Sequence, residues 1–151
     1  MSVRELTDAL ATLQRLYIET ASFIYYVEDH SKYSDKMERI FGEIDQLQIE
    51  IMTSVITLTE TLTIPLRTGD KTVEQAYRML LQATQNITLM PITVRTAERA
   101  ANLRAQYNLR TPDALHVASA IEAGCDGFLT NDLTLRRITE LRMLVLDELE
   151  I

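Results

Sequence analysis

Four carboxylates stand at or just after the ends of predicted strands, or on the helices that follow them. They are Glu19, Glu60, Asp113 and Asp132. In an open parallel sheet, binding sites lie beyond the carboxyl ends of the strands, so acids far apart in the sequence can meet there. Oxygen-only ligands select hard cations such as Mg²⁺ or Mn²⁺, and cations offset the repulsion among clustered carboxylates. The pattern therefore indicates a metal site suited to phosphodiester hydrolysis.

Hydroxyl and amide side chains near these acids could orient the carboxylates by hydrogen bonding. They are Thr20, Ser22, Thr57, Thr130 and Asn131. Each acid also has an interpretation that needs no metal, because 22 Asp and Glu residues are spread along the chain. Asp113 suits the first turn of a helix, Glu60 a solvated helix face, and Asp132 a turn or helix N-cap. His116 is more often a packed or hydrogen-bonded histidine than a base.

The elements that must position the acids follow from hydrophobic patterning. Apolar runs predict strands over 15–19, 49–54, 86–93, 127–132 and 143–149. Periodicity predicts helices over 2–13, 20–29 (helix or turn), 34–47, 55–62, 73–85, 94–106, 111–124 and 133–139. Ser2 and Glu5 could form a capping box, and Ser54, Thr93 and Thr111 are predicted N-caps. Pro65, followed by Gly69 and Asp70, is expected to end the helix that begins at 55.

Continuous apolar strands that alternate with helices are typical of a parallel sheet covered on both faces. Because crossovers between parallel strands are right-handed, the expected fold class is α/β, a three-layer α/β/α sandwich around about five parallel strands. The length of 151 residues suits a single domain over 1–151. Residues 1–14 are expected to add a helix before the first strand.

The amino-acid composition limits which partners this protein could bind and in which cellular compartment it is expected. The net charge of −7 means that a nucleic acid would have to be held by a local basic patch or by metal ions. The single cysteine, Cys125, excludes an internal disulfide and fits a reducing cytosol. No apolar run reaches the roughly 18 residues of a membrane span. We expect a cytoplasmic protein that does not interact with membranes.

Three stretches resemble the motifs of the PIN-domain family, in particular the VapC-like toxins. The most specific is RTPDALHVASAIEAGCDGFLTND (110–132), which resembles the third and fourth acidic motifs. TSVITLTETL (53–62) resembles the second, and LYIETASFIYY (16–26) occupies the place of the first. The resemblance covers about 15–149.

This resemblance implies a Mg²⁺- or Mn²⁺-dependent endoribonuclease that hydrolyses RNA phosphodiesters, with a PIN-like fold. It also implies a homodimer and a cognate antitoxin that occupies the active site. By position, Glu19, Glu60, Asp113 and Asp132 would be the metal-binding acids, with Glu60 and Asp113 holding the principal ion. A metal-bound water would attack the phosphodiester, and the hydroxyl of Thr130 would support the site.

The first motif departs from the family pattern, because Glu19-Thr20-Ala21 stands where Asp-Thr-Ser or Asp-Thr-Asn is usual. The extra methylene moves the carboxylate by about 1.5 Å, whereas metal sites tolerate errors of about 0.5 Å. This departure implies weaker activity, a preference for Mn²⁺, or loss of activity. A PIN-fold protein that binds RNA or a protein partner without cleavage is therefore the alternative. A phosphatase of another α/β fold is less favoured, because it would need a nucleophilic Asp at the first strand end.

Basic and aromatic side chains provide candidate substrate contacts. Arginine binds phosphate through its planar fork, yet any one of these arginines is more readily explained as part of a solvated helix face. The candidates are Arg95, Arg99, Arg104, Arg110, Arg136 and Arg137. Phe23, Tyr25 and Tyr26 could stack RNA bases or receive an antitoxin helix, although the core or a dimer interface is the favoured interpretation.

Overall fold

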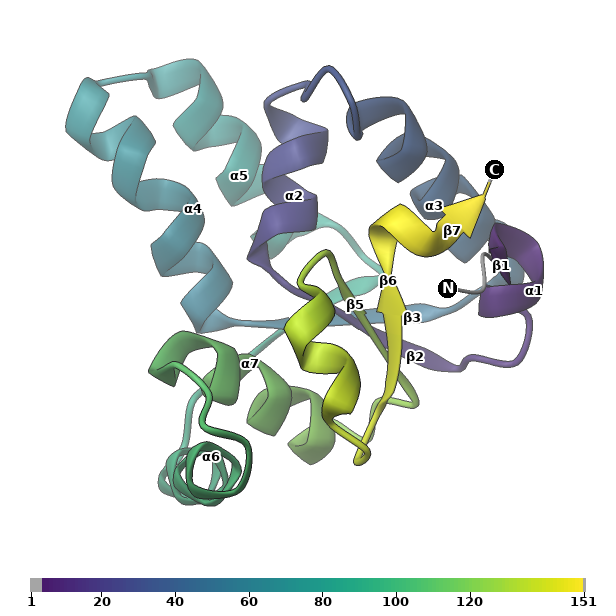
Figure 1. Cartoon of the computed structure of the whole chain (residues 1–151). Helices are drawn as coiled ribbons and strands as arrows, with labels where there is room; N and C mark the ends of the chain where they lie inside the picture. The colour runs from purple at the N-terminus through teal and green to yellow at the C-terminus, as the bar shows by residue number, and fades with distance from the viewer. Residues whose placement is uncertain (1–3, 151) are drawn as a thin grey trace.

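A five-stranded, all-parallel sheet forms the centre of the molecule (Figure 1). The computed structural model describes residues 4–150. The strands follow the order β4-β3-β2-β5-β6, so β2 is central and pairs with both β3 and β5. They are β2 (Arg15–Ile18), β3 (Glu50–Ser54), β4 (Ile87–Met90), β5 (Gly127–Thr130) and β6 (Arg142–Val145). The predicted parallel sheet of five strands is confirmed.

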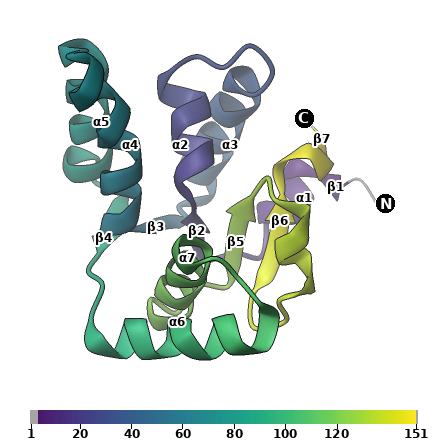
Figure 2. The same ribbon diagram turned by 60° about the vertical axis from the view of Figure 1, so that its left-hand side comes forward.

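Helices cover both faces of this sheet. They are α1 (Leu6–Leu10), α2 (Thr20–Val27), α3 (Ser34–Leu47), α4 (Val55–Thr68), α5 (Lys71–Ala83), α6 (Val94–Tyr107) and α7 (Thr111–Glu122). Leu16 and Ile18 of β2 join the apolar cluster formed with α1, α2, α3 and α5, whereas Tyr17 joins the cluster formed with α6 and α7. Figure 2 shows these helix layers on opposite sides of the sheet. The predicted three-layer α/β/α sandwich is therefore confirmed.

The caps of the helices agree with the sequence at two of three predicted positions. The hydroxyl of Ser54 accepts from the Ile56 N–H at 3.3 Å, and Thr93 caps α6. The predicted N-cap at Thr111 is wrong. The Ala114 N–H donates to the Arg110 carbonyl at 3.0 Å, so the helical ladder starts one residue earlier and Arg110 occupies the cap position.

The prediction that α4 ends at 62 is also wrong, because α4 continues through the buried Pro65 to Thr68. Proline removes a single backbone donor and here lies within the last turn, where the ladder is about to end. The helix ends at Gly69, whose φ of +73° is the left-handed conformation that glycine adopts without strain. The Asp70 N–H then donates to the Pro65 carbonyl at 2.9 Å.

The two chain ends form a second, smaller parallel sheet that patterning did not predict. β1 (Arg4–Glu5) pairs with β7 (Leu149–Glu150). The predicted helix over 2–13 is therefore shortened to α1, and Ser2 of the predicted capping box lies outside the described residues. The predicted strand over 143–149 is likewise interrupted, because β6 ends at Val145 and a 3₁₀ turn, η2 (Leu146–Glu148), redirects the chain toward β1. Among residues 4–150, no helix is long and apolar enough to cross a membrane.

Candidate active site

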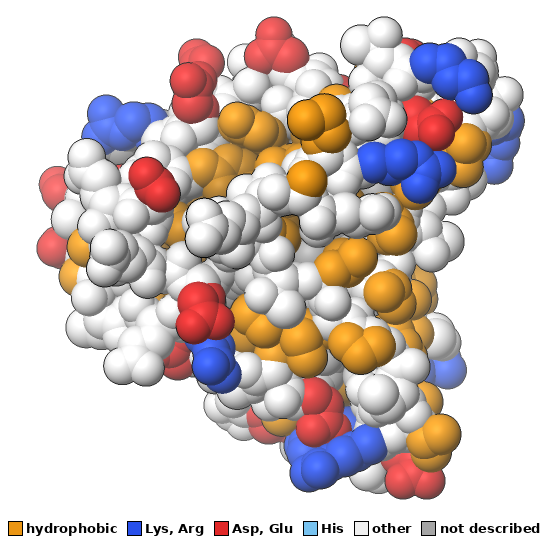
Figure 3. All heavy atoms as spheres, turned by 180° about the vertical axis from the view of Figure 1, so that it is seen from behind, with side chains coloured by type: hydrophobic (Ala, Val, Ile, Leu, Met, Phe, Trp, Pro, Cys, Tyr) orange, Lys and Arg blue, Asp and Glu red, His pale blue; other side chains and the backbone are white. Residues whose placement is uncertain are grey.

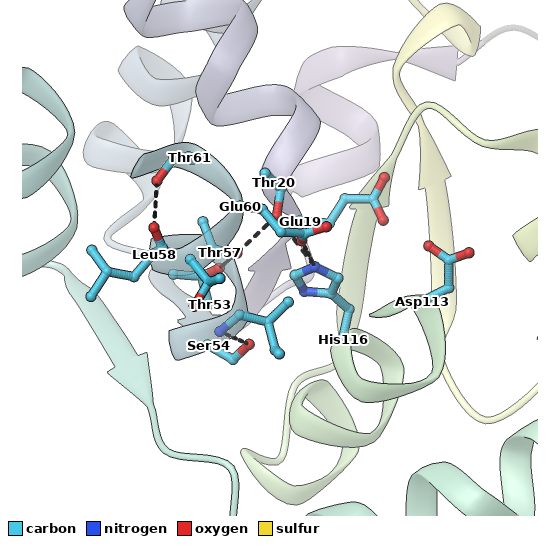
Figure 4. Close-up of polar contacts among 12 residues, drawn as sticks. Glu19, Thr20, Thr53, Ser54, Thr57, Leu58, Glu60, Thr61, Asp113 and His116 are labelled. Carbon is cyan, nitrogen blue, oxygen red and sulfur yellow. Dashed lines mark hydrogen bonds and ion pairs between the residues drawn. The ribbon is translucent and has the colours of Figure 1, made fainter. Parts of the chain in front are cut away.

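One pocket at the carboxyl edge of the sheet gathers three of the four predicted acids. It has a volume of about 230 Å³. Its lining residues are Glu19, Thr20, Ala21, Ile24, Glu60, Arg110, Asp113 and His116. Glu19 follows β2, Glu60 lies on α4, and Asp113 lies in the first turn of α7. Figure 4 shows their side chains entering the same region from these separate elements. The fold therefore brings together acids that are 41 and 53 positions apart along the chain (60 − 19 and 113 − 60).

Glu19 is a buried carboxylate held by a hydroxyl from the neighbouring strand. Its side chain and backbone are only 9% exposed. The hydroxyl of Thr130, the last residue of β5, donates to Glu19 Oε1 at 2.8 Å. Burial raises the pKa of Glu19, the Thr130 hydrogen bond opposes that shift, and the negative charges of Asp113 and Asp132 add to it. A cation in the pocket would relieve this unfavourable environment.

The pKa of Glu60 is shifted in the opposite direction from that of Glu19, because two hydrogen-bond donors contact one of its oxygens. The hydroxyl of Thr20 donates to Glu60 Oε1 at 2.7 Å, and His116 Nε2 lies 2.8 Å from the same oxygen. These contacts lower the pKa of Glu60; the hydrogen bond from His116 is the largest cause, and partial burial opposes it. Glu60 is therefore the acid that the protein itself stabilises in the ionised form.

Asp113 is paired with the arginine at the cap position of its own helix. Arg110 Nε lies 3.0 Å from Asp113 Oδ2, and Arg110 Nη2 lies 3.4 Å from Asp113 Oδ1. The guanidinium side chain remains 78% exposed, so water screens this ion pair. The only cationic side chain that lines the pocket in the described structure is thus bound to one of its acids.

Asp132, the fourth predicted acid, is not among the residues that line the pocket. Its Oδ1 accepts from the Thr134 N–H at 2.9 Å and from the Thr134 hydroxyl at 2.7 Å. These bonds cap η1, the 3₁₀ helix Leu133–Arg137. The carboxylate thus serves as a helix N-cap, although its charge still contributes to raising the pKa of Glu19.

The predicted supporting residues divide into those that reach a carboxylate and those that do not. As described above, Thr130 donates to Glu19 and Thr20 donates to Glu60. Thr57 contacts Thr20 instead of an acid, with 3.3 Å between the two Oγ1 atoms. The Asn131 side chain instead accepts from the Asp147 N–H at 3.2 Å. The buried hydroxyl of Ser22 has no hydrogen-bond partner within the described part of the chain.

All six candidate phosphate-binding arginines already interact within the chain. Arg95 and Arg99 pair with Glu122, and Arg136 pairs with Glu148. The guanidiniums of Arg104 and Arg137 donate to backbone carbonyls. Arg110 alone among them lines the acidic pocket, which makes it the arginine best placed to meet a substrate there.

The predicted aromatic cluster after β2 is partly core. Phe23 is fully buried, and Tyr25 stacks on Tyr33 with ring centroids 4.5 Å apart. Tyr26 is 38% exposed and meets Phe41 edge-on. The favoured core interpretation is confirmed for Phe23.

The donor chemistry of the pocket fits a hard cation, but the side chains do not converge as an assembled metal site. Within residues 4–150, no three Asp, Glu, His or Cys side chains lie close enough together to hold a metal ion. Glu19 is turned onto Thr130, and Asp113 is turned onto Arg110. A cation that used both acids as ligands would compete with these two contacts.

Sequence reasoning identified the acids and Thr20 as a supporting hydroxyl, but it missed the hydrogen bond between His116 and Glu60. His116 lies three residues after Asp113, a spacing that places both on one side of a helix, and this was the available signal. Its second partner is Tyr17, whose hydroxyl lies 2.7 Å from His116 Nδ1. Tyr17 reads as one more apolar residue of β2, so no local pattern reveals this contact.

We compared the sequence and the structure of this chain with those of known proteins. No curated protein matches the sequence. One similar structure is VapBC2 from Rickettsia felis, bound to a DNA fragment from the VapBC2 promoter. It gives a TM-score of 0.71 and 16% identity, over 87% of this chain and 98% of that chain. VapC20 from Mycobacterium tuberculosis, a sarcin-ricin loop cleaving toxin, gives a TM-score of 0.67 and 16% identity, over 84% of this chain and 98% of that chain. A toxin-antitoxin complex from Klebsiella pneumoniae gives a TM-score of 0.63 and 21% identity, over 87% of this chain and 97% of that chain.

The family model of the PIN domain matches residues 16–141, from β2 to the residue before β6. This range contains all four predicted acids and leaves the β1–α1 segment outside. At the identities above, the structural likeness establishes the fold. The match over most of the chain establishes the family, and this chain belongs to the PIN-domain family.

Proposed function

We propose that this chain is a metal-dependent endoribonuclease and the toxin of a toxin–antitoxin pair. The observation that carries the proposal is the pocket in which Glu19, Glu60 and Asp113 meet at the carboxyl edge of a PIN-domain sheet. VapC20, one of the similar structures, is described as a toxin that cleaves the sarcin-ricin loop. That activity is consistent with the chemistry an all-oxygen acidic pocket would support.

Glu60 and Asp113 would hold the principal Mg²⁺ or Mn²⁺ ion, with Glu19 and Asp132 as the further metal-binding acids. When bound, such an ion lowers the pKa of its water and neutralises charge on a phosphodiester. Thr20 and His116 hold Glu60 in place, and Thr130 holds Glu19. Arg110 lines the same pocket and is largely exposed, so its guanidinium fork can receive a phosphate.

The proposed setting is the cytosol, where RNA and an antitoxin are both accessible. Several similar structures are toxin–antitoxin complexes, which supports an antitoxin as the partner. A homodimer is also proposed, and large exposed apolar side chains supply candidate contacts for it. They lie on α4, α5 and α6, and are Ile64, Leu66, Met79 and Val94. Figure 3 shows hydrophobic side chains spread over the face seen from behind.

We also propose that the chain is a single PIN-like domain to which β1 and α1 are added. Leu6 and Leu10 of α1 belong to the same apolar cluster as Leu16 of β2. An element that shares the core of the sheet folds with it rather than as a separate unit.

A specific observation favours a second candidate function, a PIN-fold protein that binds RNA or a partner without cleaving. Glu19 replaces the usual Asp, and its buried carboxylate accepts a hydrogen bond from Thr130 instead of forming, within residues 4–150, a three-ligand metal group with the other acids of the pocket. A cation would have to displace this contact to use Glu19 as a ligand. If that displacement costs too much, the pocket binds its partner but performs no hydrolysis.

Cleavage and binding of one labelled, structured RNA would separate these candidates. Wild type and Glu19→Asp would be compared with Mg²⁺, with Mn²⁺, and with a chelator. The nuclease proposal expects wild type to cleave with Mn²⁺ and the chelator to stop it. The binding candidate expects wild type to bind RNA without cleavage and Glu19→Asp to cleave. Cleavage that continues in the chelator would contradict the role of the acids in both accounts.

A further inference from the structure

A chain of hydrogen bonds connects the core of the sheet to the acidic pocket. Tyr17 is fully buried and stacks on Phe128, with ring centroids 5.1 Å apart and planes 7° from parallel. Its hydroxyl lies 2.7 Å from His116 Nδ1, and His116 Nε2 lies 2.8 Å from Glu60 Oε1. His116 is only 3% exposed, so both of its ring nitrogens are committed inside the protein.

The chemistry of the partners assigns a direction to this chain for an ionised Glu60 and a neutral His116 ring. An ionised carboxylate only accepts hydrogen bonds, so His116 Nε2 must carry the proton that it shares with Glu60. In a neutral imidazole the other nitrogen is then an acceptor, and the hydroxyl of Tyr17 must donate to Nδ1. The ring is thus held at both ends, and rotating it would break both bonds.

The two oxygens of Glu60 are consequently unequal. Oε1 receives donors from His116 at 2.8 Å and from Thr20 at 2.7 Å (Figure 4). Within residues 4–150, no hydrogen bond reaches Oε2. Because Glu60 lines the pocket, the arrangement leaves Oε2 as the oxygen available to a ligand there.

We infer that Tyr17 and His116 are positioning residues that hold Oε1 of Glu60 inside the protein and so present Oε2 to the pocket. The inference rests on the proposed function only in taking the pocket ligand to be a divalent cation. His116 acts through Glu60, because the ring is buried and neither nitrogen is left for a substrate: Tyr17 engages Nδ1, and Glu60 engages Nε2, which also lies 3.3 Å from Thr20 Oγ1. Partners of this kind change metal affinity by about 10- to 100-fold when they are removed from other sites.

The first arm of the test reads the proton on His116 in metal-free protein. The chain has only two histidines, so a His30→Asn variant assigns the His116 signals in a long-range ¹H–¹⁵N spectrum. At pH of about 8.5, where free imidazole is neutral, we expect His116 to be protonated at Nε2 and unprotonated at Nδ1. Tyr17→Phe keeps the stacked ring and removes the donor, so it should shift the Nδ1 resonance. A proton on Nδ1, or an Nδ1 resonance unaffected by Tyr17→Phe, would overturn the inference.

The second arm measures Mn²⁺ affinity by calorimetry without RNA. His116→Asn shortens the side chain and withdraws the donor from Glu60, so we expect binding at least about tenfold weaker. In His116→Gln the amide nitrogen can reach the position of Nε2, and this variant should retain most of the affinity. His30→Asn, the same change at an exposed histidine, should bind as wild type does. Wild-type affinity in His116→Asn, or equal losses in the Asn and Gln variants, would contradict a positioning role.

The two arms separate failure of the inference from failure of the proposed function. If wild type binds no Mn²⁺, the proposed metal site is wrong, while the spectrum still decides whether Tyr17 and His116 hold Glu60. If His116→Asn does not fold, as judged by thermal unfolding, Tyr17→Phe takes its place in the calorimetry, with a smaller loss expected in the same direction. Unchanged affinity in that variant would then overturn the inference.

Discussion

The hydroxyl of Thr130 donates to Glu19 Oε1 at 2.8 Å and so joins the carboxyl ends of β5 and β2. The same hydroxyl accepts from the Asp132 N–H at 3.0 Å, which orders the turn that leaves β5. Thr130 thus fixes the backbone of one predicted acid and the carboxylate of another. The consequence for Glu19 is a buried carboxyl group whose main stabilising contact is the hydrogen bond from Thr130.

Glu19→Gln is expected to stabilise the metal-free protein at pH 7. Burial raises the pKa of Glu19 in the folded state above its value in the unfolded chain. The stability linked to this group is therefore fully present below the unfolded pKa and is lost as the pH rises through the folded pKa. Wild type carries that loss at pH 7, whereas the neutral amide does not. Thermal unfolding should show a melting temperature a few degrees higher for the variant.

This gain should shrink as the pH falls and disappear below about 4, the ordinary pKa of glutamate, because Glu19 is then protonated in both the folded and the unfolded chain. Glu98→Gln is the matched control, because Glu98 is exposed on α6 and is expected to unfold as wild type does at both pH values. A Glu19→Gln variant that melts at or below the wild-type temperature at pH 7 would show that the buried charge is not destabilising.

Arg110→Gln is expected to tighten Mn²⁺ binding in the absence of RNA. The guanidinium pairs with both oxygens of Asp113, and a cation must compete with it. Because water screens an exposed ion pair, the gain should be at most about fivefold. Calorimetry would measure it against Arg95→Gln, which removes an exposed arginine paired with Glu122 outside the site. Unchanged or weaker binding in Arg110→Gln would contradict competition between Arg110 and the cation for Asp113.

Leu10→Ala is expected to destabilise the fold by about 2–5 kcal/mol, because truncating a buried leucine leaves a cavity. Leu10 lies on α1, outside the matched family range, yet it is only 1% exposed and belongs to the central apolar cluster. Leu47→Ala, at a position 39% exposed at the end of α3, should cost much less. Urea unfolding compares the two. Equal effects would mean that α1 is an appended helix rather than part of the core.

The sequence predicted the sheet and most helices because local patterns govern them. The apolar runs of β2 and β3 and the caps at Ser54 and Thr93 are visible within a few residues. Pro65 misled the prediction of α4, since a proline that normally ends a helix is tolerated when only the last turn remains. The β1–β7 pairing could not be foreseen, because it joins the two ends of the chain.

For the candidate site, the sequence predicted where the acids lie but not which side chains contact them. Strand ends and helix starts indicated where Glu19, Glu60 and Asp113 would meet, since topology alone places those positions at one edge. Side-chain partners follow from distances across the fold, so the Tyr17–His116 contact had no counterpart in local patterning. The same limit applies to Asp132, whose carboxylate is engaged by Thr134 rather than by the pocket.

The central claim is that the acids of this pocket hydrolyse RNA with a divalent cation, and cleavage by Asp113→Asn tests it most directly. Asp35→Asn is the matched control, because Asp35 is also an acid in the first turn of a helix but lies on α3, away from the pocket. Wild type and Asp35→Asn should cleave a structured RNA with Mn²⁺, while Asp113→Asn should show no cleavage and a near-normal melting temperature. Cleavage by Asp113→Asn at the wild-type rate would contradict the account.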